Sequence, residues 1–258
     1  MSINLNKRYF PDFINKIQDL SNINPVVKLK IESDKILMYS MKANDSAVLA
    51  LKSYILPTIN YFDNFNEESI FDFIIVNAPK LIKSLKFFNI DTQVKMDIIY
   101  KPHNDNADVM QIRSSQFTNG KLKINSIGGE DSLIRDLNSD AIEARTDIDN
   151  ANYNFQITKR DFHDIKKLSA IDSEEKILSI DIEDGKITAS ETSKWELLVG
   201  EIDSSINQKI VFNKKYLSNI NDDMDLIDFY MFETFILVKD NISNLMLSFE
   251  QTFDDDDE

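Results

Sequence analysis

Few side chains in this sequence could carry out covalent chemistry. There is no cysteine, and the only two histidines, His103 and His163, are far apart. The strongest acid–base candidate is His163 with Asp164 or Asp161. Neighbouring residues on a helix point apart, however, and a surface histidine among lysines is more often a phosphate contact or simply solvated. We therefore expect a protein that is not an enzyme, with no catalytic residue, no metal site and no cofactor.

Basic side chains are the better candidates for a function. The two adjacent glycines, Gly128 and Gly129, do not form the glycine-rich loop that binds phosphates in nucleotide folds. Phosphate groups could instead be contacted by basic side chains. The candidates lie in four segments that we predict to be helical. These candidate DNA-binding residues are Lys7, Arg8, Lys16, Lys80, Lys83, Lys86, Lys159, Arg160, His163, Lys166, Lys167, Lys214 and Lys215.

The charge of the chain is unevenly distributed. With 29 Lys and Arg against 44 Asp and Glu, the net charge of −15 argues at first against binding to nucleic acid. The four helical segments, residues 7–20, 79–88, 158–168 and 213–221, nevertheless carry +8, which leaves −23 on the rest. The average therefore hides a set of basic helices inside an acidic chain.

Helical periodicity places most of these charges on one face. At about 100° per residue, Lys80, Lys83 and Lys86 lie opposite the apolar residues of their helix, and the basic residues around His163 lie opposite Phe162 and Ile165. The first helix is less regular, because Asp12 and Asp19 share its polar face with Arg8 and Lys16. Phe87 falls on the lysine side of its helix. A single such helix is typical of any solvated surface, but four with the same bias favour sequence-independent phosphate contacts.

The predicted helices need strands on which to pack their apolar faces. Alternating β-branched and aromatic residues predict an α+β fold rich in antiparallel strands, with turns at Ser33–Lys35 and Glu183–Lys186. The predicted strands are 26–32, 35–41, 47–55, 71–77, 94–100, 109–115 and 121–125 in the first half, and 176–183, 186–191, 194–202, 209–213, 226–232, 235–239 and 244–252 in the second.

The two halves repeat one another. KRYFPDFINKI from Lys7 matches KRDFHDIKKL from Lys159, and the other matched pairs follow in the same order. The long loop 57–70 of the first half accounts for the length difference. We predict two modules, residues 1–126 and 153–253, joined by the linker 127–152 and followed by the acidic tail 254–258.

This organisation resembles the DNA sliding clamps, most closely the trimeric processivity clamps of T-even-type bacteriophages and more distantly proliferating cell nuclear antigen. The resemblance covers almost the whole chain and is best in FQITKRDFHDIKKLSAID, ILSIDIEDGKITASETSKWELLVGEI, KIVFNKKYLSNI and IDFYMFETFILVKDN. It implies two tandem clamp modules, each a sheet-rich unit whose two helices line the inside of a ring. Three chains would complete a ring of six modules around duplex DNA.

The resemblance also implies partners. A homotrimer would tether a DNA polymerase as a processivity factor and would be opened by an ATP-dependent clamp loader. By position, the subunit seam would pair 121–125 with 194–202, and partner peptides would dock near Leu133, Ile134, Leu137, Phe249 and Phe253. Without an apolar signal peptide or a run of about 18 apolar residues, we expect no membrane partner and a cytoplasmic protein, in a host cell if the chain is of phage origin.

Two alternatives stay open at this point. A monomeric polymerase accessory protein could hold DNA on one basic face without closing a ring, and the mass in solution would separate it from a trimer. An all-β structural or adhesive protein would leave the basic helices unexplained.

Overall fold

The computed structural model describes residues 2–32, 34–44, 48–63, 71–88, 94–99, 109–117, 120–127, 134–172, 174, 176–191, 194–203 and 206–249. The chain divides into two compact units, one of residues 1–43 and 51–145 and the other of residues 44–50 and 146–258. The predicted linker 127–152 is divided between them, with residues up to Arg145 in the first unit and those from Thr146 in the second.

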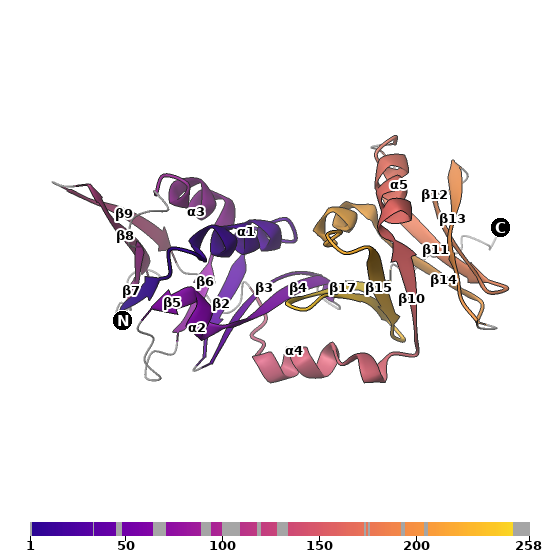
Figure 1. The fold of residues 1–258 in the computed structure, drawn as a ribbon, viewed down its shortest axis with the longest axis horizontal. Coiled ribbons are helices and arrows are strands. Elements are labelled where there is room, and N and C mark those ends of the chain that lie inside the picture. The colour runs from indigo at the N-terminus through magenta and orange to yellow at the C-terminus, as the bar shows by residue number, and fades with distance from the viewer. Residues whose placement is uncertain are drawn as a thin grey trace. The chain divides into compact units, whose positions relative to one another are not determined.

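The first unit contains two antiparallel sheets and two main helices (Figure 1). Its strands have the orders β5-β1-β7-β8-β9 and β4-β3-β2-β6. The elements are β1 (Ser2–Leu5), α1 (Phe10–Ser21), β2 (Val27–Ile31), β3 (Lys35–Ala43), β4 (Val48–Pro57), α2 (Thr58–Tyr61), β5 (Phe62–Asp63), β6 (Phe71–Ile75), α3 (Ala78–Leu85), β7 (Val94–Ile99), β8 (Val109–Phe117), β9 (Gly120–Ile127) and α4 (Ser139–Arg145).

The second unit repeats this plan. Its strands have the orders β10-β15-β16-β17 and β13-β12-β11-β14. The elements are η2 (Ile148–Asn150), β10 (Tyr153–Thr158), α5 (Lys159–Ser169), β11 (Ile177–Glu183), β12 (Lys186–Glu191), β13 (Trp195–Glu201), β14 (Gln208–Asn213), η3 (Lys214–Asn219), β15 (Leu226–Met231), β16 (Phe235–Lys239) and β17 (Ser243–Ser248). By element order, α5 corresponds to α1, η3 to α3, β13 to β4 and β17 to β9.

The core of the first unit lies where α1 and α3 pack side by side. Phe13, Ile17 and Leu20 of α1 and Leu85 of α3 are buried with side chains from both sheets. In the second unit, the alternating burial of β11 and β12 leaves one face of the sheet half-exposed while the other is buried. Phe162 and Ile165 of α5 are also buried in this unit. These apolar faces fix which side of each helix meets solvent.

The predicted fold class is confirmed: two tandem sheet-rich modules carry a few helices. The Glu183–Lys186 hairpin is also confirmed, because Asp184 and Gly185 both have positive φ in a two-residue turn. The strands β1, β5 and β10 and the helices α2 and α4 were not predicted. The predicted helix at Lys214 is a 3₁₀ helix, and α1 begins only at Phe10, so Lys7 and Arg8 precede it.

Candidate nucleic-acid interface

α3 presents the most regular basic face. The Asn77 side chain caps the helix by accepting a hydrogen bond from the Lys80 amide at 3.0 Å, and Pro79 lies in its first turn. Ala78, Leu81, Ile82 and Leu85 are buried, while Lys80, Lys83 and Lys86 are exposed. Lys86 Nζ donates a hydrogen bond to Gln18 Oε1 at 3.2 Å. The predicted opposition of apolar and basic faces is therefore present.

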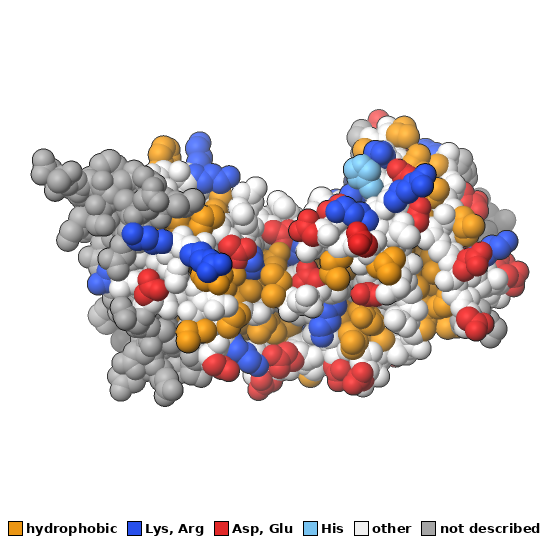
Figure 2. All heavy atoms as spheres, in the orientation of Figure 1, with side chains coloured by type: hydrophobic (Ala, Val, Ile, Leu, Met, Phe, Trp, Pro, Cys, Tyr) orange, Lys and Arg blue, Asp and Glu red, His pale blue; other side chains and the backbone are white. Residues whose placement is uncertain are grey.

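α5 offers the corresponding face in the second unit. The hydroxyl of Thr158 caps the helix by accepting from the Asp161 amide at 3.1 Å. The exposed side chains are Lys159, Arg160, His163 and Lys167, and Figure 2 shows the pale-blue histidine and blue side chains gathered over this helix.

Two lysines of α5 are paired with carboxylates. Lys166 is 26 % exposed, and its Nζ lies 2.8 Å from Asp222 Oδ2. The hydrogen bond from Lys166 holds the pKa of Asp222 below its usual value. Lys167 lies 3.5 Å from Asp164 but remains 63 % exposed, so this pair is too open to remove the lysine from a phosphate contact.

Lys16 corrects the sequence-based expectation. We expected it on the polar face of α1, but it is buried, and its Nζ lies 2.6 Å from Asp12. The same ammonium sits over the rings of Tyr54 and Tyr61, at 5.4 Å and 5.9 Å from their centroids. A cation enclosed in this way stabilises the packing of α1 and is not available to DNA.

Lys214 also differs from the expectation, because its ammonium is held inside the second unit. Its Nζ donates to the carbonyls of Ser169 and Asp172 at 2.8 Å and 2.5 Å and forms a 2.9 Å ion pair with Glu191. The Glu191 side chain is 0 % exposed and that of Lys214 is 12 % exposed. The next residue, Lys215, is exposed. Adjacent lysines in η3 thus have opposite roles, one internal and one facing solvent.

Ten of the thirteen candidate residues are exposed, and Lys166 is half-buried. Most of them lie in or directly after α3, α5 and η3, in both units, while Lys7 and Arg8 precede α1. The ten exposed residues are Lys7, Arg8, Lys80, Lys83, Lys86, Lys159, Arg160, His163, Lys167 and Lys215.

The candidate partner residues are placed differently from our expectation. Ile134 and Leu137 are buried, so they anchor the segment 134–145 to the first unit and offer no open apolar surface. Tyr39 fixes the backbone between them: its hydroxyl donates to the Arg135 carbonyl and accepts from the Leu137 amide, both at 2.9 Å. Phe249 is half-buried. Leu133, Phe253 and the tail 254–258 lie outside the described residues.

Ion pairs that sequence reasoning missed hold the same segment. Asp136 pairs with Lys30 at 2.6 Å and with Lys28 at 3.6 Å. Burial alone would raise the pKa of Asp136, but the two lysines lower it below its usual value. Lys35 Nζ also lies 2.9 Å from Glu143 of α4. These pairs could not be predicted from the acidic residues of the linker, because the lysines lie about 100 residues earlier in the chain.

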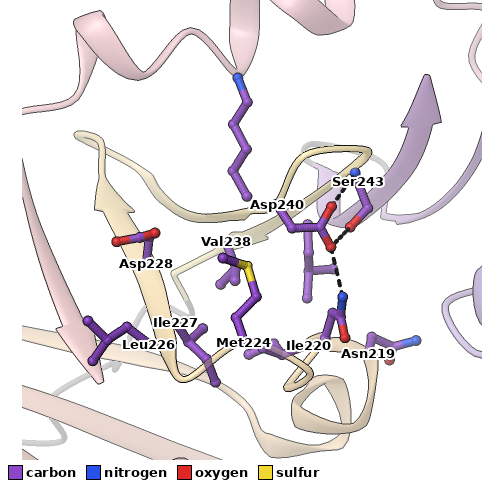
Figure 3. Close-up of a pocket in the computed structure, with 12 residues that line it drawn as sticks. Asn219, Ile220, Met224, Leu226, Ile227, Asp228, Val238, Asp240 and Ser243 are labelled. Carbon is purple, nitrogen blue, oxygen red and sulfur yellow. Dashed lines mark hydrogen bonds between the residues drawn. The ribbon is translucent and has the colours of Figure 1, made fainter. Parts of the chain in front are cut away.

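A hollow in the second unit has no evident chemistry (Figure 3). Apolar side chains such as Met224 and Ile227 line it, together with Asp228 and Asp240. Burial would raise the pKa of Asp240, but hydrogen bonds from Ile242, Ser243 and Asn221 lower it below its usual value. The Asp240 carboxylate therefore stabilises the turn between β16 and β17 through hydrogen bonds. Across the residues that the structure describes, no group of three acidic or histidine side chains could hold a metal ion.

No helix in the described part of the chain has both the length and the apolar character needed to cross a membrane. No protein-family model matches the sequence, and no curated protein matches it. Structural similarity, in contrast, extends over nearly the whole chain.

Solved structures of DNA clamps have this fold. The chain superposes on a PCNA2–PCNA3 complex of Sulfolobus tokodaii with a TM-score of 0.63 at 11 % identity, covering 97 % of this chain and 99 % of that one. For DNA polymerase III subunit beta of Pseudomonas aeruginosa, the TM-score is 0.66 at 9 % identity, covering 99 % of this chain and 66 % of that one. For proliferating cellular nuclear antigen of Entamoeba histolytica, it is 0.60 at 13 % identity, with 97 % and 98 % covered. The chain therefore has the fold of the sliding clamps.

Proposed function

We propose that this protein is a sliding clamp, a non-catalytic processivity factor that encircles duplex DNA as a homotrimeric ring and tethers a DNA polymerase. The observation that carries the proposal is the gathering of exposed basic side chains on α3, α5 and η3, in both units of a chain whose net charge is −15. The clamp fold supports it, because that fold places such helices in two similar modules.

The chemistry of the exposed lysines suits sliding. Each lysine ends in a mobile ammonium that can contact any phosphate, and such contacts are interchangeable and screened by salt. They hold the protein near the backbone without reading base edges, so no register is fixed. The acidic remainder of the chain disfavours contact with DNA elsewhere. Retention on DNA would then come from enclosure and not from affinity.

The internal repeat supports a head-to-tail ring. Within the second unit, Ser248 at the end of β17 donates a hydrogen bond to the carbonyl of Val48, the first residue of β4. The counterparts of β17 and β4 in the repeat are β9 and β13, and each lies at the end of its sheet among the described strands. Pairing β9 of one copy with β13 of the next would repeat the same arrangement between chains, with two modules per chain and three chains per ring.

The partners follow from this role. We propose duplex DNA, a DNA polymerase and an ATP-dependent loader, as in the T-even-type phage clamps that the sequence resembles, acting in the cytoplasm of the host cell. A Helicobacter pylori beta clamp with this fold was solved with a DNA ligase peptide bound, at 10 % identity to this chain and a TM-score of 0.65. Peptide segments of replication enzymes are therefore the class of protein partner that we expect.

Charge reversal on the basic helices tests the proposal. Lys80→Glu, Arg160→Glu and Lys167→Glu together should abolish stimulation of the polymerase while the protein still sediments as a trimer. The matched control, Lys42→Glu with Lys186→Glu and Lys209→Glu, changes the charge equally at exposed strand positions and should retain stimulation. Equal loss in both triple variants would show that only net charge matters and would count against a basic lining.

A further inference from the structure

Exposed apolar side chains gather around the hollow of the second unit (Figure 3). Met224 is 46 % exposed and Leu226 is 43 % exposed, and both line the hollow. Ile242 is 44 % exposed in the turn between β16 and β17, and its neighbours in that turn, Asp240 and Ser243, line the hollow as well. A large apolar side chain that is exposed singly needs no explanation, but three around one hollow are typical of an interaction surface.

The rim of this hollow is acidic. Asp228 and Asp240 line it, and Met224 lies between them in the view of Figure 3. Asp223 and Asp225, on either side of Met224 in the chain, are exposed. Within the described part of the chain, no hydrogen bond or ion pair engages the carboxylates of these last two residues. Their charges are therefore available to a partner.

The cations nearest to the hollow do not neutralise this rim. Lys239 lines the hollow, but its Nζ donates to the Thr146 carbonyl at 3.1 Å. Lys166 of α5 is paired with Asp222 at 2.8 Å. Lys159 is exposed at the start of α5, outside the residues that line the hollow. An apolar centre with a net negative rim remains.

The hollow is separate from Phe249, which the sequence resemblance implied as a contact for partner peptides. The Phe249 amide donates to the Thr234 carbonyl, in the turn between β15 and β16, at 3.2 Å. The hollow is bordered instead by the turn between β16 and β17. Because these strands are antiparallel, the two turns lie at opposite ends of β16.

We propose that this hollow docks a basic, apolar segment of another protein. An aliphatic or aromatic side chain of that segment would cover Met224 and Leu226, and its lysines or arginines would lie beside the acidic rim. Charge complementarity selects this occupant, because DNA and anionic lipids carry the same sign of charge as the rim. The inference goes beyond the proposed clamp function and applies whether or not a ring closes.

The size of the hollow suits a protein segment. It encloses about 330 Å³, which includes the open space above it. Pockets for whole small molecules hold about 300–1,000 Å³ and bury most of their ligand. An open hollow at the lower end of that range can cover a few side chains but cannot enclose a cofactor.

Binding of synthetic peptides tests the inference. One pool of short labelled peptides combines leucine or phenylalanine with lysine and arginine, and a matched pool carries glutamate in place of the basic residues. Without DNA, the basic pool should bind the full chain saturably, and the acidic pool should not bind. With isotope-labelled methyl groups in the protein, the NMR signals of Met224 and Leu226 should shift as the basic pool binds.

Variants locate the binding. Met224→Ser should weaken binding of the basic pool at least tenfold, and so should Asp223→Lys with Asp225→Lys. The matched charge control, Glu183→Lys with Glu201→Lys, changes exposed strand positions of the same unit and should bind like the wild type. Circular dichroism like that of the wild type would establish that each variant is folded.

Four outcomes would overturn the inference. The first is no saturable binding of the basic pool, and the second is equal binding of both pools, which would show that charge does not select the occupant. The third is binding that Met224→Ser and the aspartate variant leave unchanged, which would place it elsewhere on the chain. The fourth is a shift of the Met224 signal with protein concentration alone, which would show that a second copy covers the hollow.

Failure of the clamp proposal would look different. It would appear as a wild-type protein that does not form trimers, and the peptide measurements, made without DNA, would keep their meaning. Met224→Ser should retain the wild-type mass in solution and the wild-type retention on closed DNA, because the hollow contributes to neither.

Discussion

Substituting the adjacent lysines of η3 should have opposite consequences. Lys214→Met leaves the Glu191 carboxylate, whose side chain is 0 % exposed, without its ammonium partner. Removing one member of a buried ion pair costs about 3–5 kcal/mol, because the remaining charge stays desolvated. Lys215→Met removes an exposed ammonium that lies over the Tyr216 ring, 4.7 Å from the centroid. That change should cost less than about 1 kcal/mol.

DNA binding should respond in the reverse order. Each phosphate contact contributes about 0.9 to the slope of log K against log salt concentration. Lys215→Met should therefore lower that slope by about 0.9 for each copy of the chain that contacts DNA, and Lys214→Met should leave it unchanged. Urea unfolding followed by circular dichroism gives the stability, and fluorescence anisotropy of labelled duplex at several salt concentrations gives the slope.

Each variant is the control for the other. The reasoning would be refuted if Lys214→Met kept wild-type stability and lowered the salt slope. It would also be refuted if the two substitutions destabilised the protein equally, because the buried and exposed environments of the two lysines would then have no consequence.

Three further predictions concern stability. Tyr39→Phe should leave the buried Leu137 amide without its acceptor and lower the free energy of unfolding by about 1–3 kcal/mol. Hydrogen exchange within 134–145 should become faster, and unchanged exchange there would contradict the anchoring role of Tyr39. Because the pKa of Asp222 is lowered in the folded protein, its carboxylate stabilises the fold at pH values above the unfolded pKa of about 3.9, and this contribution is lost as pH falls through the folded pKa. Asp222→Asn should therefore make the free energy of unfolding fall less steeply as pH is lowered. The same pH dependence in the variant and the wild type would contradict this. Gly185→Ala, at φ 76°, should cost about 1 kcal/mol in thermal unfolding, and a neutral result would show that the turn relaxes.

The helices α3 and α5 could be predicted because their sequences are locally sufficient. Each has a capping side chain, Asn77 or Thr158, followed by apolar residues at helical spacing. The short strand β1 and the strand β10 were missed. In β10, Tyr153–Thr158 does alternate in burial, but the strand runs directly into α5 at Lys159, so no turn residues separate it from that helix.

The positions of individual lysines could be predicted only in part. Periodicity cannot distinguish Lys16 from Lys159, since both lie on polar helix faces by spacing. What buries Lys16 is the pair of rings Tyr54 and Tyr61, contributed by β4 and α2 about 40 residues later. Ile134 and Leu137 likewise read as an open apolar patch until Tyr39 and the lysines of β2 are placed beside them. Such long-range partners have no local signature in a single sequence.

Retention on closed DNA tests the central claim most directly. The protein is placed on nicked circular DNA with its loader, isolated in high salt, and the DNA is then either left closed or cut once. Encirclement predicts that protein stays on the closed circles and leaves the cut DNA from its ends within the same time. Equal release from both forms, rising with salt alone, would show that the basic helices bind DNA by charge without a ring around it.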